Sequence, residues 1–309
     1  MRMKTICAAA ALAVLSTAAS AGTGKLVLTG GVASIDGAAG GGITPWAVIG
    51  TQATEREFGA SAHVTRAVTG DYSLTASGAV FSWNERIEAS IARQDFDASP
   101  ALALNGIAPF GVQPGAHLRM DIYGLKARVA GDAVLEADTW MPQVAVGVLH
   151  KRLHPGSLGS VVSFLGAKER GTEFYVSATK LFLAPGVLVN ATARNTNANE
   201  NGLLGFGAAA PGRNSRSWNL ELSAAYLVRH DLAVGVEYRF KPNNLEALGR
   251  AAGLAGALAE SDWRDVFVAW APSRNFSATL AWADLGKVVP GITADRRQRG
   301  PYLSLQGSF

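Results

Sequence analysis

Cysteine is almost absent from this chain, which has one, Cys7, among 309 residues. A single cysteine cannot form an internal disulfide bond. Cys7 also lies in an N-terminal stretch with the pattern of a cleaved leader, so the mature chain is expected to contain no thiol. This excludes disulfide bonds, thiolate catalysis and cysteine-ligated metal sites.

Charged side chains are also scarce, at 17% of the residues, and the formal net charge is only +4. Without the N-terminal cations Arg2 and Lys4 the balance becomes 4 − 2 = +2. A nearly neutral chain has no electrostatic basis for binding nucleic acid. Beyond the N-terminus, no apolar run approaches the length of a transmembrane helix.

The first 21 residues are typical of a secretory signal peptide. Arg2 and Lys4 provide its positive region, residues 6–15 its apolar core, and Ala19-Ser20-Ala21 the small residues of a cleavage site. The apolar core is too short to span a bilayer. We therefore predict that residues 1–21 direct export and are removed, so that the mature chain begins at Gly22.

Polar and apolar residues alternate over much of the mature chain. In 217–228 the even positions are apolar and most odd positions are polar, and the pattern resumes in 232–240 after a short turn. A period of two indicates β-strands with one apolar face. These faces are long enough to cross a bilayer, and aromatic residues near the strand ends resemble the girdles of a membrane barrel. They are Trp83, Phe182, Trp218, Phe240, Trp270, Phe276 and Trp282.

The last nine residues alternate in the same way and end on an aromatic carboxyl terminus. Leu303, Leu305 and Gly307 fall on one face, with polar or amphipathic residues between them. This is typical of the closing strand of a Gram-negative outer-membrane barrel. Phe309 would then be the signal that the barrel-assembly machinery reads, although Gly307 stands where a second aromatic is usual.

Connections between these segments alternate between short and long. This predicts an all-β, up-and-down antiparallel transmembrane barrel with short periplasmic turns and longer extracellular loops. Thirteen segments have a strand pattern, and closed bacterial barrels prefer an even number, so we expect 12–14 strands. The segments are 46–52, 57–67, 72–83, 87–96, 118–129, 143–151, 172–183, 187–194, 217–228, 232–240, 263–271, 276–284 and 302–309.

One of these segments, 118–128, changes face midway. Arg119 and Asp121 fall on one face, whereas Lys126 and Arg128 fall on the other. A β-bulge near Tyr123 and Gly124 would re-aim the strand and keep all four charges away from lipid.

The Gly-rich segment 22–44 precedes the predicted barrel domain of 45–309. Its residues 25–35 could form a fourteenth strand. The run Gly37 to Gly42 offers little apolar area and weak β-propensity, which favours an alternative in which the segment folds into the lumen as a plug. The same run lacks the Gly-Lys-Ser/Thr ending of a phosphate-binding loop.

Alternation also identifies charged side chains that should point into the lumen. They would either form a charged constriction that selects a solute or a salt-bridge network that fills a narrow barrel. Glu237 and Arg239 share one face of a strand, and Glu221 lies on the preceding strand of the same hairpin. The lumen candidates are Lys126, Arg128, Glu173, Arg194, Glu221, Glu237 and Arg239.

Signals for catalysis or metal binding are weak. His150 and His154 lie at a strand end and in a loop, so helical metal-ligand geometry is not implied. The nucleophile motif Gly-x-Ser-x-Gly is absent from the sequence. We therefore expect no metal, no cofactor and no enzymatic activity, with an outer-membrane enzyme as the least favoured class.

Several stretches resemble an uncharacterised family of Gram-negative outer-membrane β-barrel proteins, known as a domain of unknown function. The resemblance covers nearly all of the mature chain, implies a barrel in the outer membrane and supplies no catalytic or binding residues. Two function classes follow: a narrow channel or transporter for a small solute or lipid, or a structural or export-accessory barrel whose loops bind partners. The solute is not indicated. The stretches are 25–31, 36–46, 171–181, 201–207, 241–245 and 262–265.

Overall fold

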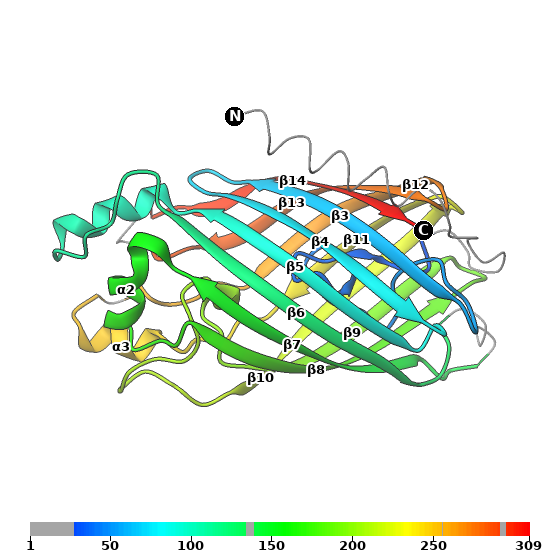
Figure 1. The fold of residues 1–309 in the computed structure, drawn as a ribbon, viewed down its shortest axis with the longest axis horizontal. Helices are drawn as coiled ribbons and strands as arrows, with labels where there is room; N and C mark the ends of the chain where they lie inside the picture. The colour runs from blue at the N-terminus through cyan, green and yellow to red at the C-terminus, as the bar shows by residue number, and fades with distance from the viewer. Residues whose placement is uncertain (1–27, 134–138, 255, 291–294) are drawn as a thin grey trace.

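The computed structural model describes residues 28–133, 139–254, 256–290 and 295–309. Within them, twelve antiparallel strands close into a barrel, each paired with its neighbours in sequence, and β14 closes onto β3 (Figure 1). This confirms the predicted fold class, at the lower end of the expected strand count. The predicted signal peptide lies outside the described residues. The wall strands are β3 (Phe58–Val68), β4 (Ser73–Trp83), β5 (Ile87–Asp97), β6 (His117–Ala130), β7 (Gln143–His154), β8 (Arg170–Phe182), β9 (Val187–Thr196), β10 (Ser217–Arg229), β11 (Leu232–Arg239), β12 (Trp263–Ser273), β13 (Phe276–Lys287) and β14 (Arg297–Ser308).

The two ends of the barrel differ in their connections. One end, here called the long-loop end, contains the connections 98–116, 155–169, 197–216, 240–262 and 288–296, together with one short turn at 69–72. The opposite short-turn end contains the connections 84–86, 131–142, 183–186, 230–231 and 274–275 and the last residue of the chain. Short helices lie in the long loops, at the left of Figure 1. They are η1 (Ser99–Gly106), η2 (Gly156–Leu158), α2 (Gly159–Phe164), η3 (Glu200–Gly202) and α3 (Glu246–Ala251).

The predicted faces of the strands are those observed. On β10, Leu222 is 40% exposed on the outer surface, whereas its neighbours Glu221 and Ser223 are buried in the lumen. On the paired strand β11, Val236 is 50% exposed and Glu237 is buried. The barrel therefore has an apolar exterior and a polar interior, as the period of two requires. No described helix is long and apolar enough to cross a membrane.

The wall begins at Phe58, which corrects the predicted boundary near residue 45. Residues 46–52 are not a wall strand, and residues 28–35 of the other candidate segment also lie outside the wall. Residues 29–53, here called the lumen segment, run inside the barrel, where Figure 1 shows the blue chain. This segment includes the small hairpin of β1 (Val32–Ala33) and β2 (Ala39–Gly40).

The physical reason for this correction lies in the backbone bonding of residues 46–50. Trp46 N–H donates to Ala39 O within the lumen segment (3.2 Å), whereas the bonds to the wall are made by inward side chains: Ala47 N–H donates to Thr179 Oγ1 (2.8 Å), and Gln143 Nε2 donates to Ala47 O (2.8 Å). Trp46, Val48 and Ile49 are all buried because protein surrounds the segment on every side. The run Trp46 to Ile49 is apolar throughout because it is enclosed in the lumen and has no side that faces water.

Strand β6 also contains no bulge at Tyr123 and Gly124. Its register is unbroken there with both β5 and β7, and shifts only between Arg128 and Ala130. Arg119 and Asp121 remain on the outer face because they lie near the long-loop end, where they pair with other charges. Arg119 Nε contacts Asp95 at 2.9 Å, and Asp121 accepts from Arg93 at 2.6 Å.

Candidate functional site

The lumen segment is held to the wall by a buried ion pair on β5 and β6. Lys126 Nζ lies 3.0 Å from Glu88 Oε2, and both side chains are 1% exposed. Lys126 also donates to the carbonyls of Ala39 (2.9 Å) and Val48 (2.7 Å). Glu88 accepts from the backbone N–H groups of Ala39 (3.0 Å) and Gly50 (2.8 Å). The pair therefore satisfies polar backbone groups that a buried segment must not leave unpaired.

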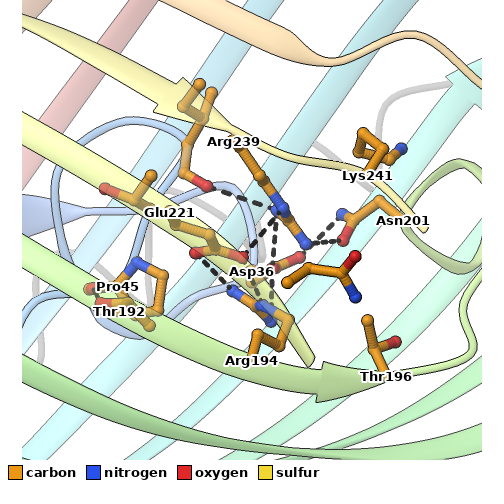
Figure 2. A network of polar contacts seen from close by, with 12 residues as sticks. Asp36, Pro45, Thr192, Arg194, Thr196, Asn201, Glu221, Arg239 and Lys241 are labelled. Carbon is orange, nitrogen blue, oxygen red and sulfur yellow. Dashed lines mark hydrogen bonds and ion pairs between the residues drawn. The ribbon is translucent and has the colours of Figure 1, made fainter. Parts of the chain in front are cut away.

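A second cluster centres on Asp36 of the lumen segment, as Figure 2 shows. Its carboxylate lies 3.1 Å from Lys151, 3.4 Å from Arg194 and 3.4 Å from Arg239. Two wall carboxylates complete the cluster. Glu173 contacts Lys151 (2.9 Å) and Arg194 (3.1 Å), and Glu221 contacts Arg194 (2.6 Å) and Arg239 (3.1 Å). Three cations thus face three carboxylates.

Asn201, in the loop between β9 and β10, ties the same cluster to the long-loop end. Its side-chain oxygen accepts from Lys151 Nζ and from Arg239, each at 2.7 Å. Its amide nitrogen donates to Asp36 at 2.9 Å. The lumen segment, five wall strands and one loop therefore share one buried polar network, in which removal of a single member leaves charges unpaired.

A third contact holds the glycine run against β11. Glu237 accepts from Ile43 N–H (2.9 Å), from Ser223 Oγ (3.1 Å) and from the hydroxyl of Thr44. A Cβ on Gly41 would lie 2.0 Å from Glu237 Oε1. Because the backbone passes directly against the carboxylate here, a larger residue would have to displace Glu237 from its hydrogen bonds to the lumen segment.

The lumen candidates thus fall into three places. Glu173, Arg194, Glu221 and Arg239 lie together in the Asp36 cluster, whereas Lys126 and Glu237 each bind the lumen segment separately. Arg128 lies at the short-turn end and pairs with Asp132 at 2.8 Å. Sequence reasoning missed Asp36, Glu88 and Lys151. The position of Lys151, two residues after the inward Leu149, would have identified it, whereas no pattern places Asp36.

An apolar chamber of about 190 Å³ lies between the lumen segment and the long loops. The lumen segment contributes Ile35 and Ile43, and the wall contributes aromatic residues that include Trp263. Side chains of the long loops cover the other side. Further members of the lining are Phe96, Ala101, Leu104, Phe110, Leu118, Leu158, Phe164, Leu203 and Leu258. A comparable apolar cavity of about 150 Å³ in another protein stays dry and binds benzene.

Buried charges connect the loops that cover this chamber. Lys241 Nζ lies 3.1 Å from Glu200 and 3.2 Å from Glu260, and 4.1 Å from the ring centre of Trp263. Burial raises the pKa of Glu260 to about 8. The positive charge of Lys241 opposes this rise only partly, and the nearby carboxylate of Glu200 adds to it. The loop cover therefore contains a carboxyl group that titrates near neutral pH.

His150 and His154 both lie on the outer face of β7, where they contact Thr172 (2.9 Å) and Asp121 (3.1 Å). Over the described residues, no group of three or more His, Cys, Asp and Glu side chains could hold a metal ion.

Several solved outer-membrane barrels have a similar fold. The NanC porin matches with a TM-score of 0.50 and 8% identity, over 80% of this chain and 98% of the porin. The KdgM porin matches with a TM-score of 0.47 and 9% identity, over 81% and 99% of the two chains. An outer-membrane channel from Pseudomonas putida matches with a TM-score of 0.46 and 13% identity, over 84% and 96%. At 8% identity, the likeness to the NanC porin shows the fold alone.

No curated protein matches this chain. Residues 29–306 match the model of a family described as protein of unknown function, DUF3034. That range includes the lumen segment as well as the wall, which confirms the resemblance inferred from the sequence. The chain therefore belongs to the DUF3034 family.

Proposed function

We propose that this protein spans the outer membrane and takes up a small apolar molecule through a gated path. The apolar chamber beneath the long loops is the observation that carries the proposal, because the charged groups of the lumen are already engaged in buried ion pairs and hydrogen bonds. An apolar ligand gains free energy by leaving water for such a chamber. Its volume of about 190 Å³ suits a molecule of roughly one aromatic ring.

A gate is part of the proposal because the lumen segment lies between the chamber and the short-turn end. The lumen charges that would have suited an open hydrophilic pore are paired with one another or with this segment. Passage would therefore require the segment to move. A purely structural barrel is the alternative that the filled lumen also favours.

Toluene provides the direct test, by titration calorimetry of the purified barrel in neutral detergent. We expect saturable binding of one toluene per barrel. Ala101→Phe fills the chamber from helix η1 and should weaken binding at least about tenfold, or ~1.4 kcal/mol. The matched control is Ala103→Phe, on the exposed face of the same helix, which should bind as the parent does. Absence of saturable binding, or equal loss in both variants, would refute the chamber as the ligand site and favour the structural barrel.

A further inference from the structure

An arginine cluster on the outer surface of the barrel is the starting point. Arg264 of β12 and Arg297 and Arg299 of β14 all contact the single carboxylate of Asp284 on β13, at 3.0, 2.9 and 3.0 Å. Asp284 is 9% exposed and also accepts from Gly286 N–H, whereas the three arginine side chains are 52%, 39% and 49% exposed. Three cations against one anion leave a net charge of +2.

The depth of this arginine cluster on the wall suits a lipid headgroup. Arg264, Asp284 and Arg299 form one row across three paired strands near the long-loop end. In the next row toward the short-turn end, Val266 and Trp282 are each 55% exposed. Exposed aromatics at such positions mark the membrane interface in barrels. The arginines therefore lie immediately above the proposed apolar band, where headgroup phosphates are found.

An apolar groove of about 920 Å³ leads away from the cluster along the outer wall. It reaches from Arg299 and Asp284 across β12, β11, β10 and β9 to β8. Small outward residues, Ala191 and Ala224, form its floor beside Leu222, Val236 and Val266. A charged end joined to a long apolar channel fits an amphiphile, with its anionic head at one end and its acyl chain in the channel.

We propose that this face binds a phosphorylated lipid of the outer leaflet, with phosphate on Arg264, Arg297 and Arg299 and an acyl chain in the groove. Arginine forms bidentate, charge-assisted hydrogen bonds with phosphate oxygens, and Asp284 holds the three guanidinium groups together before the lipid arrives. The excess charge of +2 matches a phosphate dianion. The inference rests on the proposed membrane location, and it is independent of the chamber.

The test measures binding of purified bisphosphorylated lipid A to the barrel in neutral detergent, by native mass spectrometry. The triple variant Arg264→Gln, Arg297→Gln and Arg299→Gln should bind at least about tenfold more weakly, since it removes all three charge-assisted contacts. The matched control is Arg229→Gln, an outer-surface arginine at the short-turn end, which should bind as the parent does. A heat-dependent shift on electrophoresis confirms that each variant is folded.

A second variant examines the groove without changing any charge. Ala191→Leu together with Ala224→Leu fills the floor and should also weaken lipid A binding severalfold. Inorganic phosphate at millimolar concentration should not compete, and toluene binding in the chamber should be unchanged in every variant. The proposal is overturned if the triple variant binds like the parent, if the Arg229→Gln control loses as much, if filling the groove has no effect, or if free phosphate displaces the lipid.

Discussion

The outward side chains of the strands determine what the wall can contact. Leu222 lies midway along β10 on the outer face, and an arginine there would place a charge near the bilayer midplane. We expect Leu222→Arg to cost about 2–4 kcal/mol of folding free energy, against about 0–1 kcal/mol for Val228→Arg near the strand end. Unfolding of the barrel in lipid vesicles measures both. Equal costs would show that the depth assignment is wrong.

The inward neighbour Ser223 offers no easier site. It contacts Glu237 at 3.1 Å and accepts from the indole nitrogen of Trp46 at 3.0 Å. Replacement of Ser223 by arginine would therefore disrupt the contacts that hold the lumen segment. Inward positions that contact this segment are thus not expected to tolerate a charge.

Glu260 gives the loop cover a pH dependence. Its pKa in the folded protein, about 8, lies above the ordinary 4.5, so folding favours its protonated form. The contribution of protonated Glu260 to the free energy of unfolding is therefore fully present below about pH 4.5, and it is lost as the pH rises through 8. The charged groups facing it are Lys241 and Glu200. We expect the free energy of unfolding, measured relative to Glu260→Gln, to fall from pH 5 to pH 9. A constant difference between the two proteins would contradict this.

At the scale of elements, the lumen segment is held by contacts that differ from those of the wall. The wall strands bond to one another through backbone ladders, whereas the lumen segment is bonded to the wall through wall side chains such as Glu88, Thr179 and Lys126. It can therefore be removed without breaking a wall ladder. The closed ladder from β3 to β14 is the physical reason to expect independent stability of the wall.

Deletion of residues 25–42 should accordingly leave a folded barrel with raised single-channel conductance. It removes Asp36 and leaves Lys151, Arg194 and Arg239 facing two carboxylates. Water that enters the emptied lumen would hydrate these charges.

A point variant gives the same test without shortening the chain. Gly41→Val would collide with Glu237, whereas Gly42→Ala adds a Cβ at 3.4 Å from its nearest atoms and is the control. Unchanged conductance in a folded deletion would refute the plug, and loss of the barrel would show that folding needs the segment.

At the scale of the whole molecule, closure joins the two ends of the wall. The backbone of Phe309 donates to Ala60 O (2.8 Å) and accepts from Ala60 N–H (3.0 Å), beside the β14–β3 seam. Phe309→Ala keeps this backbone but removes the ring. If the ring is the assembly signal, this variant should reach the outer membrane at a severalfold lower level, as a heat-modifiable band on electrophoresis, whereas Phe309→Tyr should assemble normally. Normal levels of Phe309→Ala would contradict this role.

The barrel could be predicted from the sequence because its signals are local. Strand faces follow a period of two, as in β10 and β11, and each wall strand meets its neighbour in sequence. No long-range information was needed to place Leu222 outside or Glu221 inside.

The one segment wrongly predicted as a wall strand from its apolar run is 46–52. An apolar run has the same sequence pattern whether it lies in a wall or is enclosed in a lumen.

The candidate site depended on contacts distant in sequence. Asp36 meets Arg194 and Arg239 only because the lumen segment turns back inside the closed wall, and the glycines and alanines of 37–42 that follow it have no strand or helix pattern. The chamber and the outer groove likewise need side chains from many strands and loops to converge. The wall and its two faces follow from the amino-acid order alone, since alternation is a property of each strand. What fills the lumen is set in three dimensions only, because its buried charges pair with residues that are distant in sequence and close in the folded barrel.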